Sequence, residues 1–131
     1  MANPWAHGRI NNESSYDLIL VEKTLVGTDQ HRWNKEPPDK IPAKTQMNDV
    51  YDAMSNTAIW GYVSIGAVYE ASVDGFVVTI TFGITANDHA AGASGANYKL
   101  SKDKILNVYQ HAHPDHGSEV TATFTVREWP D

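Results

Sequence analysis

The strict alternation of residues 76–82 limits what this chain can fold into more than any other feature. Apolar side chains recur at every second position from Phe76 to Phe82, with valine or threonine between them. This period of two, built from β-branched and aromatic residues, predicts a strand. Residues 62–71 have a similar composition, and Asp74-Gly75 between the two runs favours a tight turn with positive φ. The sequence therefore predicts a central β-hairpin over residues 60–82.

Other short apolar runs extend this pattern along the chain. Residues 9–21 and 120–126 predict further strands, whereas the three prolines of residues 36–44 favour an extended surface connection. Residues 45–59 are interpreted as a loop, with a short helix over Val50, Tyr51 and Met54 as the alternative, and the glycine-rich residues 83–97 as a second loop. The sequence predicts an all-β fold, an antiparallel β-sandwich of six to eight short strands, because the connections are too short for crossovers.

The length of 131 residues indicates one domain over residues 1–131. Pro4 and Gly8 predict that residues 1–8 form an N-terminal arm, with Trp5 packed onto the body. The chain begins without an apolar signal region and has no apolar run long enough to span a membrane. We expect a protein that is cytoplasmic in the producing cell or released without a signal peptide.

Charge and cysteine content exclude several function classes. A net charge of −6 disfavours nucleic acid as a partner, since phosphate binding needs clustered basic residues. The absence of cysteine excludes disulfides, thiolate metal sites and a cysteine nucleophile. No paired carboxylates, phosphate loop or ordered triad supports catalysis. We therefore expect no enzyme and no cofactor.

One histidine-rich motif needs separate treatment. His111, His113, Asp115 and His116 match the pattern His-x-His-x-Asp-His, which resembles the zinc signature of the metallo-β-lactamase superfamily. That fold is much longer than this chain, and no histidine follows His116 to complete its ligand set. We interpret residues 110–117 as a polar turn, and at most an adventitious zinc or nickel site. A small metal-dependent hydrolase built on the motif is retained as an alternative.

Aromatic residues in polar surroundings give the candidate binding site. Trp33 lies beside Arg32 in a polar stretch, where an indole suits either sugar stacking or a membrane interface, or else plugs the end of the sandwich. The long loop before residue 98 adds a second set of candidates. Together the candidate lipid- or ligand-binding residues are Arg32, Trp33, Asp88, His89, Asn97 and Tyr98.

The order of several small motifs matches a known family. These motifs are Asn11-Asn12, Arg32-Trp33, the run from Gly61 to Tyr69, Asp74-Gly75 and the run from Gly95 to Tyr98. In this order the chain resembles the aegerolysin family of small β-sandwich cytolysins, in particular the small partner of the two-component insecticidal crystal proteins. The resemblance implies a β-sandwich that binds membrane lipid and acts with a larger pore-forming protein.

The sequence therefore favours a toxin-like, membrane-lipid-binding protein without enzymatic activity. A lectin-like module that binds a glycan through Trp33 or Tyr98 is the first alternative, and the metal-dependent hydrolase is the second. The identity of the ligand and self-association into a homo-oligomer are left open by the sequence.

Overall fold

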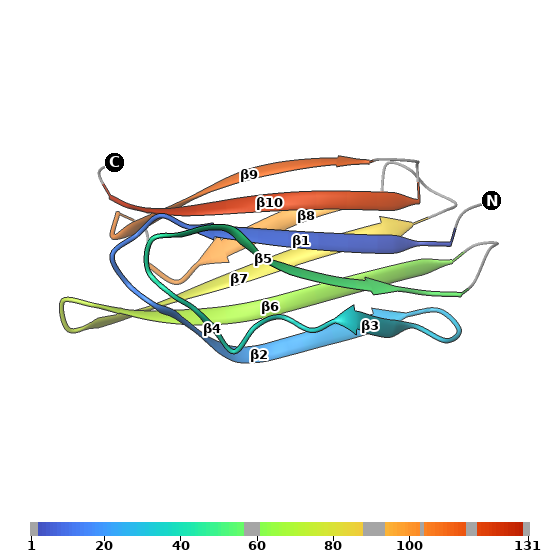
Figure 1. Ribbon diagram of the computed structural model, residues 1–131, viewed down its shortest axis with the longest axis horizontal. Coiled ribbons are helices and arrows are strands. Elements are labelled where there is room, and N and C mark those ends of the chain that lie inside the picture. The colour runs from blue at the N-terminus through green and yellow to red at the C-terminus, as the bar shows by residue number, and fades with distance from the viewer. Residues whose placement is uncertain (1–2, 57–60, 88–93, 103, 115–117, 130–131) are drawn as a thin grey trace.

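The chain folds into two facing β-sheets (Figure 1). The structure, a computed structural model, describes residues 3–56, 61–87, 94–102, 104–114 and 118–129, which form ten strands and no helix. Sheet A has the strand order β3 (Arg32–Lys35), β5 (Thr45–Met54), β1 (Trp5–Asn12), β10 (Glu119–Glu128) and β9 (Leu106–Pro114). Sheet B has the order β4 (Lys40–Ile41), β2 (Leu18–Gly27), β6 (Tyr62–Val73), β7 (Phe76–Asn87) and β8 (Gly95–Leu100). The predicted β-sandwich is confirmed.

The central hairpin is confirmed as strands β6 and β7. They pair antiparallel from Tyr62 opposite Asn87 to Val73 opposite Phe76. Asp74 and Gly75 both have positive φ, of 48° and 87°, as a two-residue type I′ turn requires. The hairpin is longer than predicted, and its tip reaches beyond the other strands at the end of the sandwich where β10 (Glu119–Glu128) ends (Figure 1).

The core lies between the sheets, and the alternation of each long strand selects the side chains that fill it. Every second residue of β6, β7 and β10 is buried, with the exceptions of Phe76 at the hairpin tip and Glu128 at the end of β10. Phe82 of sheet B meets Phe124 of sheet A with ring centroids 4.7 Å apart, and Tyr69 packs against Phe82 at 6.2 Å. The Tyr69 hydroxyl donates to the Pro38 carbonyl, 2.7 Å away, and so fixes the proline-rich connection to the body.

The expected N-terminal arm is wrong for residues 5–8. Trp5–Asn12 forms β1, which lies in the middle of sheet A between β5 and β10. Gly8 is not a breaker here. A Cβ at Gly8 would lie 2.4 Å from the ring of Tyr51, so the glycine lets the β5 tyrosine pack directly against the β1 backbone.

The loop expected over residues 45–59 is wrong for its first ten residues. Thr45–Met54 forms β5, with β1 on one side and β3 on the other. The sequence of β5 is polar and weakly patterned, but β1 pairs with it from Thr45 to Met54 across one irregularity, and β3 pairs with residues 52–54, so the segment is a strand rather than a loop or a short helix. Tertiary pairing therefore outweighs local strand propensity at this segment.

The expectation of purely antiparallel pairing is also wrong at one place. β1 and β10 pair in parallel from Trp5 opposite Glu119 to Asn12 opposite Val126. The rule that short connections impose antiparallel pairing does not apply to them, because they are the first and last strands and no short connection joins them. The number of strands also exceeds the six to eight predicted, because β3 and β4 are too short to be recognised as strands in the sequence.

Two further segments are more regular than expected. β7 runs to Asn87 and β8 begins at Gly95, so residues 83–87 and 95–97 of the predicted loop belong to strands. Likewise Gln110–Pro114, expected as part of a turn, belongs to β9 and pairs with β10. No helix in the described part of the chain is long and apolar enough to cross a membrane.

Candidate functional site

The structure does not gather the predicted binding residues into one site. Arg32 and Trp33 lie on β3, an edge strand of sheet A, whereas Asn97 and Tyr98 lie on β8, an edge strand of sheet B. β8 lies next to β9, on the opposite side of the sandwich from β3, and the Gln110 side chain donates to the Ala96 carbonyl across this seam at 2.8 Å. Asp88 and His89 lie outside the described residues.

Trp33 has a packing role in the structure. Its ring is half-buried against the core and lies 6.4 Å from the ring of the buried Tyr51. Arg32 is exposed, and its guanidinium lies 3.4 Å from both the Asn56 side-chain oxygen and the Met54 sulfur. Tyr98 is 42% exposed, and the Asn97 side chain lies over Gly83 on the outer face of sheet B.

The histidine motif is divided between a strand and residues that the structure does not describe. His111 lies on β9 opposite Thr123, and the backbone of His113 lies opposite Thr121. Asp115 and His116 lie outside the described residues. Within the described part of the chain, no group of three or more histidine, aspartate or glutamate residues could share a metal ion.

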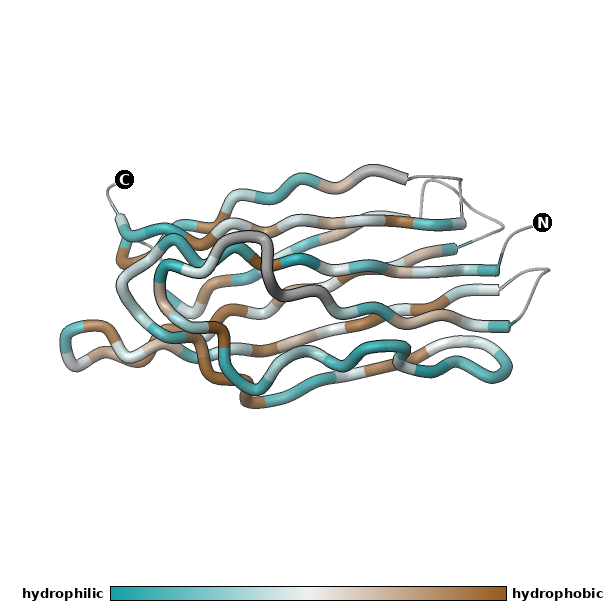
Figure 2. Tube along the Cα trace, viewed as in Figure 1, coloured by the Kyte–Doolittle hydropathy of each residue, from teal (hydrophilic) through white to brown (hydrophobic). Residues whose placement is uncertain are grey.

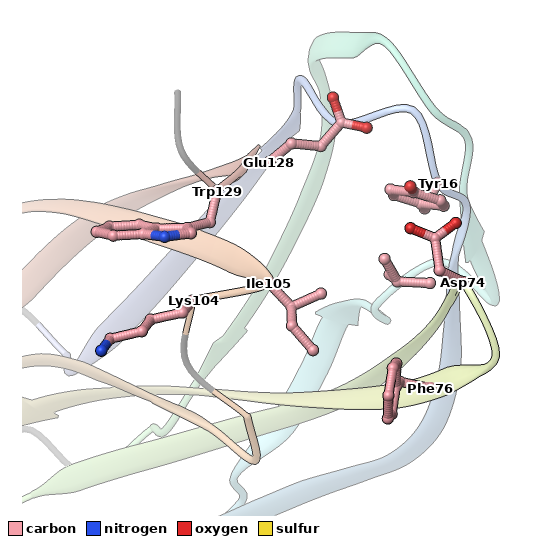
Figure 3. A pocket seen from close by; sticks show the side chains of 8 residues that line it. Tyr16, Asp74, Phe76, Lys104, Ile105, Glu128 and Trp129 are labelled. Carbon is pink, nitrogen blue, oxygen red and sulfur yellow. The ribbon is translucent and has the colours of Figure 1, made fainter.

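A different site forms at the end of the sandwich that carries the β6–β7 hairpin (Figure 3). It is a cavity of about 450 Å³ between the β1–β2 connection, the hairpin tip, the start of β9 and the end of β10. In Figure 3, Tyr16, Asp74 and Phe76 lie on one side, Lys104 and Trp129 lie on the other, and Ile105 points between them. The lining residues are Tyr16, Val73, Asp74, Phe76, Lys104, Ile105, Glu128 and Trp129.

A buried asparagine fixes the wall that carries Tyr16. The Asn12 amide nitrogen lies 2.7 Å from the Tyr16 carbonyl and 3.2 Å from the carbonyls of both Ile41 and Pro42. Its carbonyl oxygen accepts hydrogen bonds from the backbone nitrogen and the hydroxyl of Ser14, at 3.1 and 2.6 Å. The Asn-Asn opening noted in the sequence thus holds the β1–β2 connection onto the β4 segment.

Backbone hydrogen bonds fix the opposite wall. The Trp129 amide donates to the Ile105 carbonyl at 3.0 Å, which holds the backbone of Trp129 against the segment that enters β9. Glu13 joins the two walls, because its amide donates to the Val126 carbonyl and its carboxylate pairs with Arg127 at 2.7 Å. Backbone hydrogen bonds therefore hold the segments that form the cavity walls.

The cavity has an acidic character around Tyr16. Partial burial raises the pKa of the Tyr16 phenol above its ordinary value, and the negative charges of Asp74 and Glu128 raise it further. Tyr16 therefore remains a neutral hydroxyl at physiological pH. Within the described residues neither Asp74 nor Glu128 is paired with a basic side chain.

Apolar side chains are exposed around the same cavity. Phe76 is 54% exposed, Val77 is 51% exposed and Trp129 is 46% exposed. Figure 2 shows hydrophobic residues in the hairpin where it reaches beyond the other strands. A second hollow of about 490 Å³ adjoins the other side of Tyr16 and includes the exposed Ile19. This end of the molecule combines apolar surface with an acidic, ring-lined cavity.

Few features of the sequence point to this cavity. Its residues come from four segments that are distant along the chain, and no one of these segments has a sequence pattern typical of a binding site. Phe76, for example, is in phase with the core-facing residues of its strand. Only exposure, which the sequence does not contain, separates Phe76 from the buried Val78. Neither a protein-family model nor a curated protein matches this sequence.

Proposed function

We propose that this protein binds membrane lipid, without enzymatic activity, through the end of the sandwich that carries the β6–β7 hairpin. The observation that supports this proposal is the exposure of Phe76, Val77 and Trp129 around one cavity. Side chains of this kind enter the interfacial layer of a bilayer, and an indole is favoured there because it is apolar with one polar group. We therefore centre the proposed lipid contact on this end of the sandwich and not on Arg32 and Trp33.

We further propose a toxin-like role on the resemblance to aegerolysins, in which a larger pore-forming partner completes lysis. In this role the chain alone binds vesicles and does not release an entrapped dye. Dye release by the chain alone at the concentration that saturates vesicle binding would contradict the need for a partner.

Two valines provide a matched test of the docking end. Val77 lies opposite Ser72 and Val26 lies opposite Ser64, so both project from the outer face of sheet B. They are 51% and 54% exposed, but Val77 adjoins the hairpin tip and Val26 lies at the far end of β2. In co-sedimentation with phosphatidylcholine–sphingolipid vesicles, we expect Val77→Ser to weaken binding about five-fold, from the loss of about 1 kcal/mol of apolar burial.

Val26→Ser should bind these vesicles as the unmodified protein does. Equal losses in the two variants would mean that the contact is not at the hairpin end, and no binding to any vesicle would refute lipid binding. A glycan array tests the lectin alternative, since an exposed indole such as that of Trp129 also suits a sugar. A signal that free saccharide inhibits would favour the lectin.

A further inference from the structure

The two carboxylates of the end cavity lack a cationic partner. Asp74 comes from the hairpin turn and Glu128 from the end of β10, and both are close enough to Tyr16 to act on its phenol. Lys104 also lines the cavity, but Figure 3 shows its side chain on the Trp129 side, pointing away from Tyr16. The region between Tyr16, Asp74 and Glu128 is therefore a site of negative potential that favours a positive charge.

Two aromatic rings lie on the same side of the cavity as Asp74. They belong to Tyr16 and Phe76, and ring faces attract cations through their quadrupoles, whereas the Trp129 indole lies on the other side with Lys104 (Figure 3). The Phe76 ring already makes one such contact, because the ammonium of Lys102, which does not line the cavity, lies 5.8 Å from the ring centroid. Ring faces and unpaired carboxylates together favour an ammonium ligand.

The apolar lining distinguishes between kinds of cation. Val73 and Ile105 contribute alkyl surface, which suits the carbon substituents of an organic nitrogen. A calcium ion needs about six to eight oxygen ligands, and the cavity residues supply two carboxylates and one phenol side-chain oxygen. The lining therefore suits an alkylated nitrogen better than a metal ion.

We propose that the end cavity recognises an organic ammonium group, held between the Asp74 and Glu128 carboxylates and against the rings of Tyr16 and Phe76. On a bilayer the ammonium belongs to a lipid headgroup, and in that form the inference rests on the proposed membrane binding. A free ammonium compound satisfies the same contacts in solution, so the cavity can be tested without a membrane.

The first experiment uses soluble probes. Choline and tetramethylammonium are titrated into the full chain, and amide shifts are followed by NMR. The control is 3,3-dimethyl-1-butanol, which has the shape of choline without its charge. We expect saturable shifts of residues 74–76 and 128–129 with both ammonium compounds, and at least about ten-fold weaker binding of the alcohol. Equal affinity for choline and the alcohol, or no saturable shift, would overturn the proposal.

Charge-neutralising variants locate the site. Glu128→Gln and Asp74→Asn remove one carboxylate each, and asparagine tolerates the positive φ of residue 74, so the turn is retained. Glu22→Gln removes the same charge from the exposed face of β2, outside the cavity. We expect choline affinity to fall about ten-fold in each cavity variant and to stay unchanged in Glu22→Gln. Wild-type affinity in both cavity variants would refute the site.

Vesicles separate this inference from the proposed function. Phosphatidylcholine vesicles carry the ammonium, and vesicles of uncharged digalactosyldiacylglycerol lack it. Preference for phosphatidylcholine, lost in Glu128→Gln, supports both proposals. Equal binding to the two lipids would support the proposed membrane binding and refute ammonium recognition. Choline binding in solution without vesicle binding retains the cavity and refutes the membrane role.

Discussion

Tyr51 carries a polar atom that the core leaves without a partner. Its ring is fully buried beneath Gly8, and its hydroxyl has no hydrogen-bond partner among the described residues. A buried hydroxyl without a partner costs stability, and burial also raises the pKa of the phenol above its ordinary value of about 10. The ring contributes packing while its oxygen opposes folding.

Tyr51→Phe should therefore stabilise the protein by about 1 kcal/mol at pH 7, measured by urea unfolding. Because the folded state holds the phenol proton more tightly than the unfolded state, the contribution of this phenol to stability is constant below pH about 10 and falls above it. Most of this alkaline fall should disappear in Tyr51→Phe, and a remainder should come from Tyr16. An unchanged alkaline slope in the variant would contradict this account.

Asn12 is a buried polar residue whose side chain stabilises the fold, because its polar atoms are hydrogen-bonded. It is fully buried and satisfies carbonyl groups of three other residues, which would lose their donor in Asn12→Ala. We expect a loss of about 2–4 kcal/mol in the free energy of unfolding, together with weaker choline binding as Tyr16 moves. The neighbouring Asn11 is less buried, and its amide lies 3.5 Å from the Thr125 hydroxyl. Asn11→Ala should cost less than about 1 kcal/mol, and equal losses would refute the role of Asn12.

At the scale of elements, the β6–β7 hairpin depends on its turn. Gly75 has a φ of 87°, and a Cβ added there would meet no atom within 4 Å. Any cost of Gly75→Ala is therefore backbone strain, of about 1 kcal/mol, without a clash. Gly75→Asn should cost less, because asparagine tolerates the left-handed region.

This pair of variants tests how the turn supports the cavity, since Asp74 and Phe76 flank Gly75. Thermal unfolding measures the stability loss, and choline titration measures the effect on the site. We expect Gly75→Ala to weaken choline binding more than Gly75→Asn does. Identical stability of the two variants and the unmodified protein would show that the turn carries no strain.

At the scale of the whole molecule, β1 joins the two ends of the chain. It pairs with β5 on one side and β10 on the other, so sheet A is continuous only through β1. An arm could be removed without harm, but a central strand cannot. Deletion of residues 1–8 should therefore abolish cooperative unfolding, followed by circular dichroism and by the dispersion of NMR signals. A truncated chain with native signals would contradict the central position of β1.

The buried faces of the three strands β6, β7 and β10 were predictable from the sequence. The buried faces of β6 and β7 and the Asp74-Gly75 turn follow from local rules, because side-chain direction alternates along a strand and a type I′ turn demands specific residues. The inward positions of β10, such as Ala122 and Phe124, were predicted for the same reason and are buried. In each case the information lies within about a dozen neighbouring residues.

The sequence near each strand does not show which other strands it pairs with. β5 is a strand because β1 and β3 satisfy its backbone, and β1 lies beside β10 although the chain separates them almost completely. The cavity follows the same logic, since Tyr16, Asp74, Ile105 and Glu128 meet only after both sheets are assembled. Alternation specifies which face of a strand is buried, whereas hydrogen bonding between distant strands specifies its neighbours, and the neighbours create the site.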